Sequence, residues 1–193
     1  MYKFIWAFSL TLLFGQYDYS LEDINPSSEY YNQNIGTSYF SGQVTLHYFG
    51  HYNWGTCSTR FGQLNDLYEN LLQDGYTNVK LIGVGKSQHM SSLGNWINNN
   101  DASVCADQSS FAAWNGWEAS QRDLFILNHT GDLVLHQNIT SGLPENLEEL
   151  VIELIAEIPD CDPDLMCGEA LTCVDELLYP TTCGPDNCDE PID

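Results

Sequence analysis

The segments Gln43-Val-Thr-Leu-His-Tyr-Phe49 and Trp54-Gly-Thr-Cys57 decide the fold of this chain. The first is rich in β-branched, aromatic and other apolar residues, which predicts a strand. Residues 58–72 predict a helix that ends at Gly75, because one broad face carries Phe61, Leu64, Leu67, Leu71 and Leu72. The run Trp54–Cys57 therefore lies where a strand leads into the start of a helix.

A cysteine at the start of a helix is a candidate redox residue, because backbone N–H groups and the helix dipole stabilise a thiolate there. In a Cys-x-x-Cys pair the first cysteine attacks a disulfide and the second resolves the mixed disulfide. Here the first position is Trp54, and only Cys57 is present. Cys57 is therefore either a resolving or lone nucleophilic thiol, or a structural cysteine that is buried or paired with Cys105.

The remaining elements complete an α/β order. Strands are predicted over Lys80–Val84 and Ala102–Ala106, and a weak helix over Ser91–Asn98. Residues 123–136 predict a β-hairpin with Gly131 in its turn, and an amphipathic helix begins near Pro144. Parallel strands joined by helices can share one sheet with an antiparallel hairpin, so we expect a mixed central sheet flanked by helices.

The two ends of the chain differ from this central region. Residues 1–15 have the charged start and short apolar core of a secretory signal peptide, and this apolar core is too short to span a bilayer. Residues 16–41 are polar and tyrosine-rich and predict an extended lead-in. Residues 159–193 hold five of the seven cysteines and ten acidic residues, at spacings that match no zinc site. We expect an acidic, disulfide-containing tail with one cysteine left free, paired with Cys57 or Cys105, or joined to another chain.

Composition excludes several classes of partner. The net charge is −22, from five Lys and Arg against 27 Asp and Glu, so phosphate backbones and anionic membranes would repel the chain. No EF-hand or zinc template is present, so neither a metal nor a cofactor is expected. The seven cysteines and the sequons Asn128-His-Thr130 and Asn138-Ile-Thr140 agree with a secreted, extracellular glycoprotein without a membrane anchor.

Several segments, taken in order, resemble one known family. Gly42–Cys57, Leu64-Asn-Asp-Leu67, Asp74-Gly-Tyr-Thr-Asn78 and Asp123–Val134 are similar to the N-terminal domain of selenoprotein P. The resemblance implies a secreted thioredoxin-like domain over residues 42–158. Its reactive pair would be selenocysteine (or cysteine in relatives), two residues, then cysteine, acting on disulfides or peroxides. Selenium transport belongs to selenocysteine-rich tails in that family, and this tail contains cysteines instead.

Aligned by that motif, Trp54 occupies the selenocysteine position and Cys57 the resolving position. An indole carbon cannot form a mixed disulfide or a selenenyl intermediate. Selenocysteine is encoded by UGA, which some translation tables read as tryptophan, so Trp54 is either genuine or a mis-decoded selenocysteine. Two hypotheses follow: a thiol- or selenol-dependent oxidoreductase, or a catalytically inactive module that binds an extracellular protein partner or is structural.

Other candidate residues have structural alternatives. His47 and His51 flank the turn, and each is expected to be an ordinary satisfied or exposed histidine. Arg122-Asp123 lies where many thioredoxin-like proteins have a cis-proline, and Asp123 either influences protonation at the site or is a solvated loop charge. Trp114 and Trp117 are either lid and stacking residues or, as we expect, anchors in the core.

Overall fold

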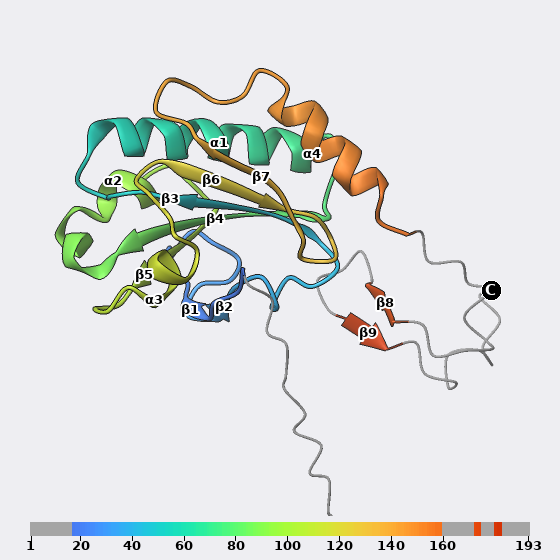
Figure 1. Ribbon diagram of the computed structural model, residues 1–193, viewed down its shortest axis with the longest axis horizontal. Helices are drawn as coiled ribbons and strands as arrows, with labels where there is room; N and C mark the ends of the chain where they lie inside the picture. The colour runs from blue at the N-terminus through green and yellow to red at the C-terminus, as the bar shows by residue number, and fades with distance from the viewer. Residues whose placement is uncertain (1–16, 160–171, 175–179, 183–193) are drawn as a thin grey trace, which may run out of the picture.

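The computed structural model describes residues 17–159, 172–174 and 180–182, and Figure 1 shows its central sheet. The sheet has five strands in the order β5-β4-β3-β6-β7. β3 pairs in parallel with β4, and β4 with β5, whereas the pairs β3–β6 and β6–β7 are antiparallel. The mixed sheet predicted from the sequence is thereby confirmed. The strand bounds are β3 Val44–Phe49, β4 Val79–Lys86, β5 Ser103–Asp107, β6 Asp123–Leu127 and β7 Leu133–Asn138.

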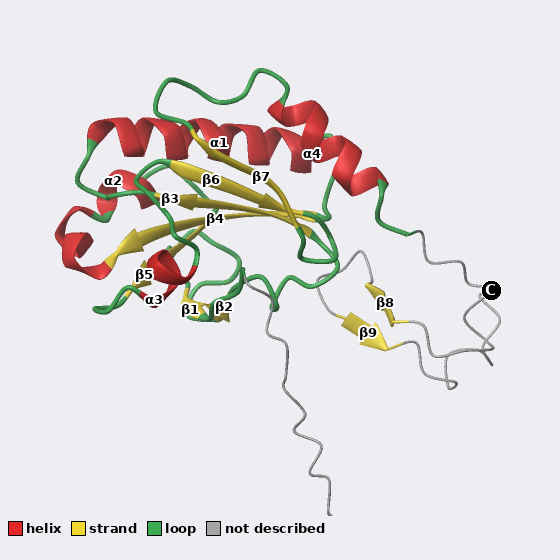
Figure 2. Cartoon of the chain, viewed as in Figure 1, coloured by secondary structure: helices red, strands yellow, loops and turns green. Residues whose placement is uncertain are grey.

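Helices and short strands cover the two faces of this sheet. Helices α1 (Gly55–Gln73) and α4 (Leu147–Ala156) lie on one face (Figure 2). The other face carries α3 (Ala112–Gly116) and the small antiparallel pair of β1 (Leu21–Glu22) and β2 (Asn34–Ile35). The remaining elements are a 3-10 helix η1 (Ser87–Ser92), α2 (Gly94–Ile97), and an antiparallel pair of β8 (Thr172–Val174) and β9 (Pro180–Thr182).

Helix α1 begins earlier than its apolar pattern predicts, at Gly55 rather than Ser58. Cys57 therefore lies in its first turn. Phe61, Leu64 and Leu71 of this helix are buried, and the chain reverses at Gly75, whose φ of 91° is a conformation that glycine adopts at little cost. The apolar stripe holds α1 on the sheet, so the position of its N-terminus is determined by the packing of the whole helix.

Two cores lie on opposite faces of the sheet. The helix-side core is formed by β3, β4 and helices α1 and α4, and it contains Cys57, Phe61 and Trp96. The second core contains Cys105 together with aromatic residues of the lead-in, β3, α3 and β6. A fully buried Phe or Leu contributes about 1.5–3 kcal/mol through the hydrophobic effect, so both faces stabilise the sheet.

Residues 17–41, which the sequence suggests as a lead-in, contribute directly to the second core. Ile35 and Phe40 are almost completely buried. Asp23 accepts a hydrogen bond from the Val104 backbone N–H at 3.0 Å, and Asn25 donates to the carbonyl oxygens of Asn100 and Ala102 at 2.8 Å. Because polar side chains satisfy backbone groups at the edge strand β5, this segment covers an otherwise open sheet edge.

The structure differs from the sequence-based expectations in two places. The weak helix over residues 91–98 is divided into η1 and α2, and α3 has no counterpart in the sequence-based prediction. The hairpin is confirmed, with Gly131 at φ 83° in its turn. The predicted signal peptide over residues 1–15 and most of the predicted tail over residues 159–193 lie outside the described residues. Within the described part of the chain, no helix is both long and apolar enough to span a membrane.

Candidate active site at the start of helix α1

Trp54 is the residue immediately before helix α1, and its side chain is 49% exposed. Its backbone carbonyl accepts a hydrogen bond from the Ser58 N–H at 3.1 Å, which begins the helix. The edge of the indole faces the His51 ring, with the centroids 5.9 Å apart, and the Arg122 guanidinium carbon lies 6.0 Å from the indole centroid. Position 54 is therefore the solvent-facing residue of the turn between β3 and α1.

Cys57 is completely buried one turn further along the helix. Its Sγ accepts hydrogen bonds from the Gln121 side-chain amide at 3.2 Å and from Arg122 Nη1 at 3.9 Å. The Tyr48 hydroxyl donates to its carbonyl oxygen at 3.2 Å. Because both donors to the sulfur come from the loop before β6, that loop and the start of α1 form one site.

The loop before β6 is held rigidly at Arg122. The Arg122 N–H donates to the Phe49 carbonyl at 2.7 Å, and its carbonyl accepts from the Ile139 N–H at 2.8 Å. Its Nε donates to Thr140 Oγ1 at 2.7 Å. The backbone φ of Arg122 is 70°, which costs a non-glycine residue free energy and which the surrounding hydrogen bonds maintain. The described residues contain no cis peptide bond, so arginine and not cis-proline faces the start of the helix.

The Cys57 sulfur is an acceptor for two side-chain donors, a cationic guanidinium and a neutral amide. It also lies in the first turn of α1, where backbone N–H groups have no partner within the helix. The site has an exposed position where an attacking group would stand and a buried sulfur where a resolving group would stand. With tryptophan at the exposed position, residues 17–159 present no exposed thiol, because Cys57 and Cys105 are both buried.

Cys105 lies apart from this site. The sequence left open a Cys57–Cys105 disulfide, and this alternative is wrong, because both residues are free thiols in separate cores. Cys105 Sγ lies 3.7 Å from the Leu21 carbonyl oxygen. Burial, together with Asp23 and Glu22, raises the pKa of the Cys105 thiol well above its ordinary value, which keeps it protonated and unreactive.

The two flanking histidines have different environments. His47 is fully buried in β3, where its Nδ1 is 2.7 Å from the Tyr19 hydroxyl and burial lowers its pKa to about 3. His51 is half-buried beside Trp54. Its pKa is lowered by burial and by the neighbouring His89, Lys86 and Arg122. Only His51 therefore belongs to the surface around position 54.

Asp123 does not contact the cysteine. Its carboxylate accepts hydrogen bonds from the Ser120 N–H at 2.7 Å and from Asn138 Nδ2 at 2.8 Å, and it lies 3.1 Å from His136 Nε2. The alternative of a solvated loop charge is wrong, because Asp123 is only 4% exposed. Asp123 joins the start of β6 to the end of β7 and so supports the loop that carries Arg122.

Trp114 and Trp117 are buried, which confirms their expected role as core anchors. Trp117 packs against His47 and Phe49. Trp114 also borders the site, since its ring lies 5.6 Å from His51 and 4.5 Å from the Lys86 ammonium.

Sequence reasoning missed two groups that shape the site, namely the Gln121 amide and the Tyr48 hydroxyl. Gln121 lies two residues before the predicted hairpin, and a loop at that place faces the helix start in this element order, so its position was the available signal. Tyr48 carried no signal, because an aromatic residue in a buried strand is usual. Within residues 17–159, no three His, Cys, Asp or Glu side chains lie close enough together to hold a metal ion.

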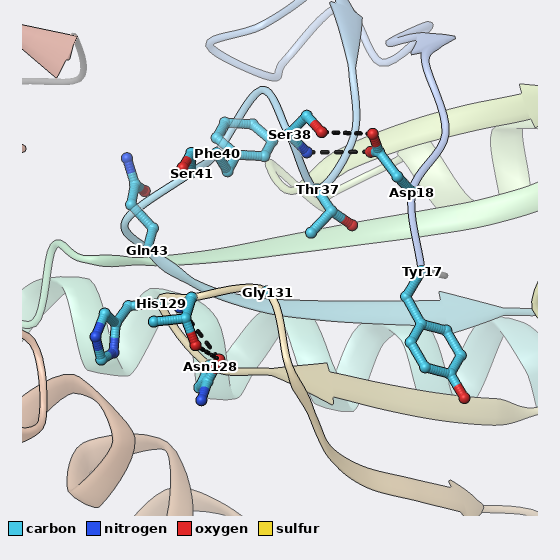
Figure 3. A pocket seen from close by; sticks show the side chains of 11 residues that line it. Tyr17, Asp18, Thr37, Ser38, Phe40, Ser41, Gln43, Asn128, His129 and Gly131 are labelled. Atoms are coloured by element: carbon cyan, nitrogen blue, oxygen red, sulfur yellow. Dashed lines mark hydrogen bonds between the residues drawn. The ribbon is translucent and has the colours of Figure 1, made fainter. Parts of the chain in front are cut away.

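A pocket of about 150 Å³ lies at the far end of β6, away from Cys57 (Figure 3). Lead-in residues such as Asp18 and Ser38 line it together with the hairpin turn that contains Asn128 and Gly131. Asp18 and Asn128 accept hydrogen bonds from Ser38 and Thr130 respectively within this lining. The pocket is therefore polar and separate from the candidate active site.

The fold has many solved counterparts. The thioredoxin domain of a thiol-disulfide oxidoreductase from Bacteroides vulgatus is similar with a TM-score of 0.57 and 12% identity, over 72% of this chain and 93% of that chain. A secreted Mycobacterium tuberculosis disulfide oxidoreductase, homologous to E. coli DsbE, gives 0.52 and 12%, over 73% and 97%. A member of the Sco family of cytochrome c oxidase assembly proteins, studied for a disulfide switch, gives 0.56 and 14%, over 72% and 92%. The protein therefore has a thioredoxin-like fold.

Comparison of the sequence does not place the chain in a family within this fold. No protein-family model matches the chain, and comparison with curated proteins gives no match.

Proposed function

We propose that this protein is a thiol- or selenol-dependent oxidoreductase that reduces disulfides or peroxides. Position 54 is the attacking residue and Cys57 is the resolving residue. One observation carries the proposal: position 54 stands exposed before α1, while the Cys57 sulfur lies one turn away under donors from Gln121 and Arg122. Solved thiol-disulfide oxidoreductases of the same fold support a redox role.

The chemistry requires selenocysteine or cysteine at position 54. A selenolate there attacks a disulfide, so that a selenium–sulfur bond forms, the sulfur–sulfur bond breaks and one thiolate leaves. The Cys57 thiolate then attacks the selenium and releases the second thiol, which leaves an intramolecular Se–S bond. With a peroxide, the selenolate attacks one oxygen, so that a selenium–oxygen bond forms, the oxygen–oxygen bond breaks and an alcohol or water leaves. The Cys57 thiol then attacks the selenium, which forms the Se–S bond and releases the oxygen as water. An external thiol reductant returns the Se–S bond to selenolate and thiol.

The particular assignment is a selenoprotein P-like domain in which Trp54 is a mis-decoded selenocysteine. The support is the register of residues 54–57 with that family's reactive pair and the exposure of position 54. Mass spectrometry of the peptide that contains residues 54–57, from protein isolated from its source, tests the assignment. We expect the isotope pattern of selenium, and a tryptophan mass would overturn it.

A second experiment tests the site itself. Trp54→Cys restores two cysteines at the ends of the turn, and we expect this variant to form a 54–57 disulfide and to reduce insulin with dithiothreitol as the reductant. Trp54→Cys with Cys57→Ser is the matched control, since it keeps the attacking thiol without the resolving one. If the single variant neither forms the disulfide nor exceeds the double variant in turnover, the site cannot support exchange.

The alternative is an inactive binding or structural module. The observations that favour it are the full burial of Cys57 and the contacts of the Trp54 indole with His51 and Arg122. Within residues 17–159 no thiol is exposed. Alkylation of the native protein with N-ethylmaleimide separates the two readings. Labelling at Cys57 faster than at Cys105 favours a reactive site, whereas equal protection of both favours the module.

We further propose that the protein is exported, with residues 1–15 removed as a signal peptide and with its redox or protein partner in the extracellular space. The support is the pattern of the first 15 residues, the two sequons and the cysteine-rich tail. N-terminal sequencing of protein recovered from culture medium tests this. Retention of residues 1–15, or absence from the medium, would contradict it, and a diagonal gel tests for a disulfide to another chain.

A further inference from the structure

The few basic residues of this acidic chain are distributed unevenly. Of its five Lys and Arg, four lie beyond residue 16, namely Arg60, Lys80, Lys86 and Arg122. Lys86 ends β4, Arg122 precedes β6, and Arg60 belongs to the early part of α1. The end of β4, the start of β6 and the start of α1 lie at the same end of the sheet, where β3 also ends (Figure 1). Lys80 lies near the opposite end of β4. The cations are thus concentrated around position 54.

A continuous series of contacts joins the two outer cations. The Arg122 guanidinium lies 6.0 Å from the Trp54 ring, which is 5.9 Å from the His51 ring. His51 is 5.6 Å from Trp114, and the Lys86 ammonium lies 4.5 Å from the Trp114 ring. We call these five residues the cationic face. It consists of two cations with three aromatic rings between them, beside the candidate active site.

No carboxylate forms an ion pair with these cations within the described residues, where the one ion pair joins His136 and Asp123. Asp107, the register partner of Lys86, is buried, and its Oδ2 accepts a hydrogen bond from the Trp114 N–H at 3.0 Å. The charged neighbours that shift the pKa of His51 are His89, Lys86 and Arg122, and all of them lower it. The cationic face is therefore a local positive region on a protein whose net charge is −22.

We propose that the cationic face binds an acidic polypeptide segment and holds it beside position 54. The inference rests on the proposed function in naming this segment as part of the redox substrate. Arg122 and Lys86 are separated by three rings, so one small anion would not engage both. An extended peptide advances about 3.3 Å per residue, so carboxylates several residues apart can reach the two cations while the intervening side chains contact Trp54.

The rest of the molecule contributes to selectivity. Repulsion from its acidic surface opposes the docking of an acidic segment anywhere else, which directs the segment to this face. At about 0.15 M salt the screening length is about 8 Å, so the distant negative charges are attenuated while contacts to Arg122 and Lys86 persist. Arginine can also hold a carboxylate through two parallel hydrogen bonds, which adds geometric selection.

The test measures fluorescence anisotropy of labelled hexaglutamate at about 0.15 M salt, with labelled hexaglutamine and hexalysine as comparison peptides. We expect hexaglutamate to bind more tightly than hexaglutamine. Lys86→Gln and Arg122→Gln should each weaken binding at least fivefold, and Lys86→Arg should retain it. Lys80→Gln is the matched control and should leave binding unchanged. Hexaglutamate binding no tighter than hexaglutamine, or an equal loss with Lys80→Gln, would overturn the inference.

The same titration on the Cys57→Ser variant separates this inference from the proposed function. That variant cannot resolve an exchange intermediate, yet its cationic face is unchanged, so hexaglutamate should bind as before. Hexaglutamate binding by the Trp54→Cys variant without redox activity would support the face and contradict the oxidoreductase. Redox activity without hexaglutamate binding would overturn the face alone. Circular dichroism of each variant verifies that a loss of binding is not a loss of folding.

Discussion

The guanidinium of Arg122 lies 3.9 Å from the sulfur of Cys57, although 65 residues separate the two in sequence. The contact depends on the adjacency of β3 and β6, since the Arg122 N–H is bonded to the carbonyl at the end of β3. A positive φ at Arg122 accompanies this arrangement. The position that faces the start of the helix therefore carries a charged hydrogen-bond donor, and its effect on the sulfur can be measured.

We predict that Arg122→Gln lowers the reduction potential of the 54–57 disulfide in the Trp54→Cys variant by about 30 mV, which corresponds to about 1.4 kcal/mol. The reduced form loses a charge-assisted hydrogen bond to Cys57, so the disulfide becomes harder to reduce. Equilibration with glutathione buffers measures the potential. Arg60→Gln is the control, because Arg60 bonds the Ile139 and Thr140 carbonyls and not the sulfur. Equal shifts in both variants would refute a specific role for Arg122.

We predict that His47 makes the fold sensitive to acid. Burial lowers its folded-state pKa from 6.5 to about 3, so below pH 6.5 the unfolded state binds a proton that the folded state excludes. Stability from this group is complete above pH 6.5 and is lost as the pH falls towards 3, with about 3 kcal/mol lost by pH 4. Urea unfolding at a series of pH values measures this slope.

The matched variant for that experiment is His47→Leu with Tyr19→Phe, which removes the titrating ring and its hydroxyl partner together. Carboxylates contribute equally to the pH dependence of both proteins, so the difference between them isolates His47. Identical slopes from pH 6.5 to 4 would show that the folded protein takes up the proton without cost.

We predict that Gly36→Ala destabilises the attachment of the lead-in. A Cβ at this position would lie 1.7 Å from the Tyr19 carbonyl oxygen, so the backbone itself must move. We expect a loss of about 2–3 kcal/mol in urea unfolding, as for other overpacked sites, and faster proteolysis before residue 42. Gly116→Ala is the control, since nothing lies within 4 Å of its added Cβ and alanine favours a helix. Similar effects of the two changes would contradict a docked lead-in.

We predict that Asp123→Ala lowers stability by about 2–3 kcal/mol, because three donors from Ser120, Asn138 and His136 lose their buried acceptor. Asp66→Asn, on the exposed side of α1, should change stability by less than about 0.5 kcal/mol. Thermal unfolding measures both. An Asp123→Ala variant as stable as the parent would show that these hydrogen bonds are replaced by solvent.

Local patterns were sufficient for the elements that carry strong periodicity. The strand at residues 44–49, the helix after it and the hairpin with Gly131 depend on contacts close in sequence, so apolar spacing and turn chemistry predict them. Helix α1 extends three residues earlier than its apolar stripe, because glycine and threonine continue a helix without contributing to a pattern. Helix α3 is too short for any periodicity to be recognised.

The candidate site was only partly predictable. The sequence placed Trp54 and Cys57 at the start of a helix and Arg122 before the hairpin. It did not predict that Gln121 and Arg122 both reach the sulfur, because those contacts join segments more than 60 residues apart. It predicted an extended lead-in over residues 16–41 but not that this segment packs against β5 and the second core. A polar, tyrosine-rich stretch has no periodicity that reveals the surface it contacts.

The sequence by itself determined the order of the elements, the presence of only one cysteine in the run Trp54–Cys57 and the strong acidity of the chain. These properties follow from residue identity and short-range spacing. Only the tertiary structure decided that Cys57 and Cys105 are free thiols in separate cores. It also decided that Arg60, Lys86 and Arg122 come from elements that meet at the end of the sheet where β3 ends. The physical reason is that pairing of β3 with both β4 and β6 brings distant segments together, and no local pattern encodes such contacts.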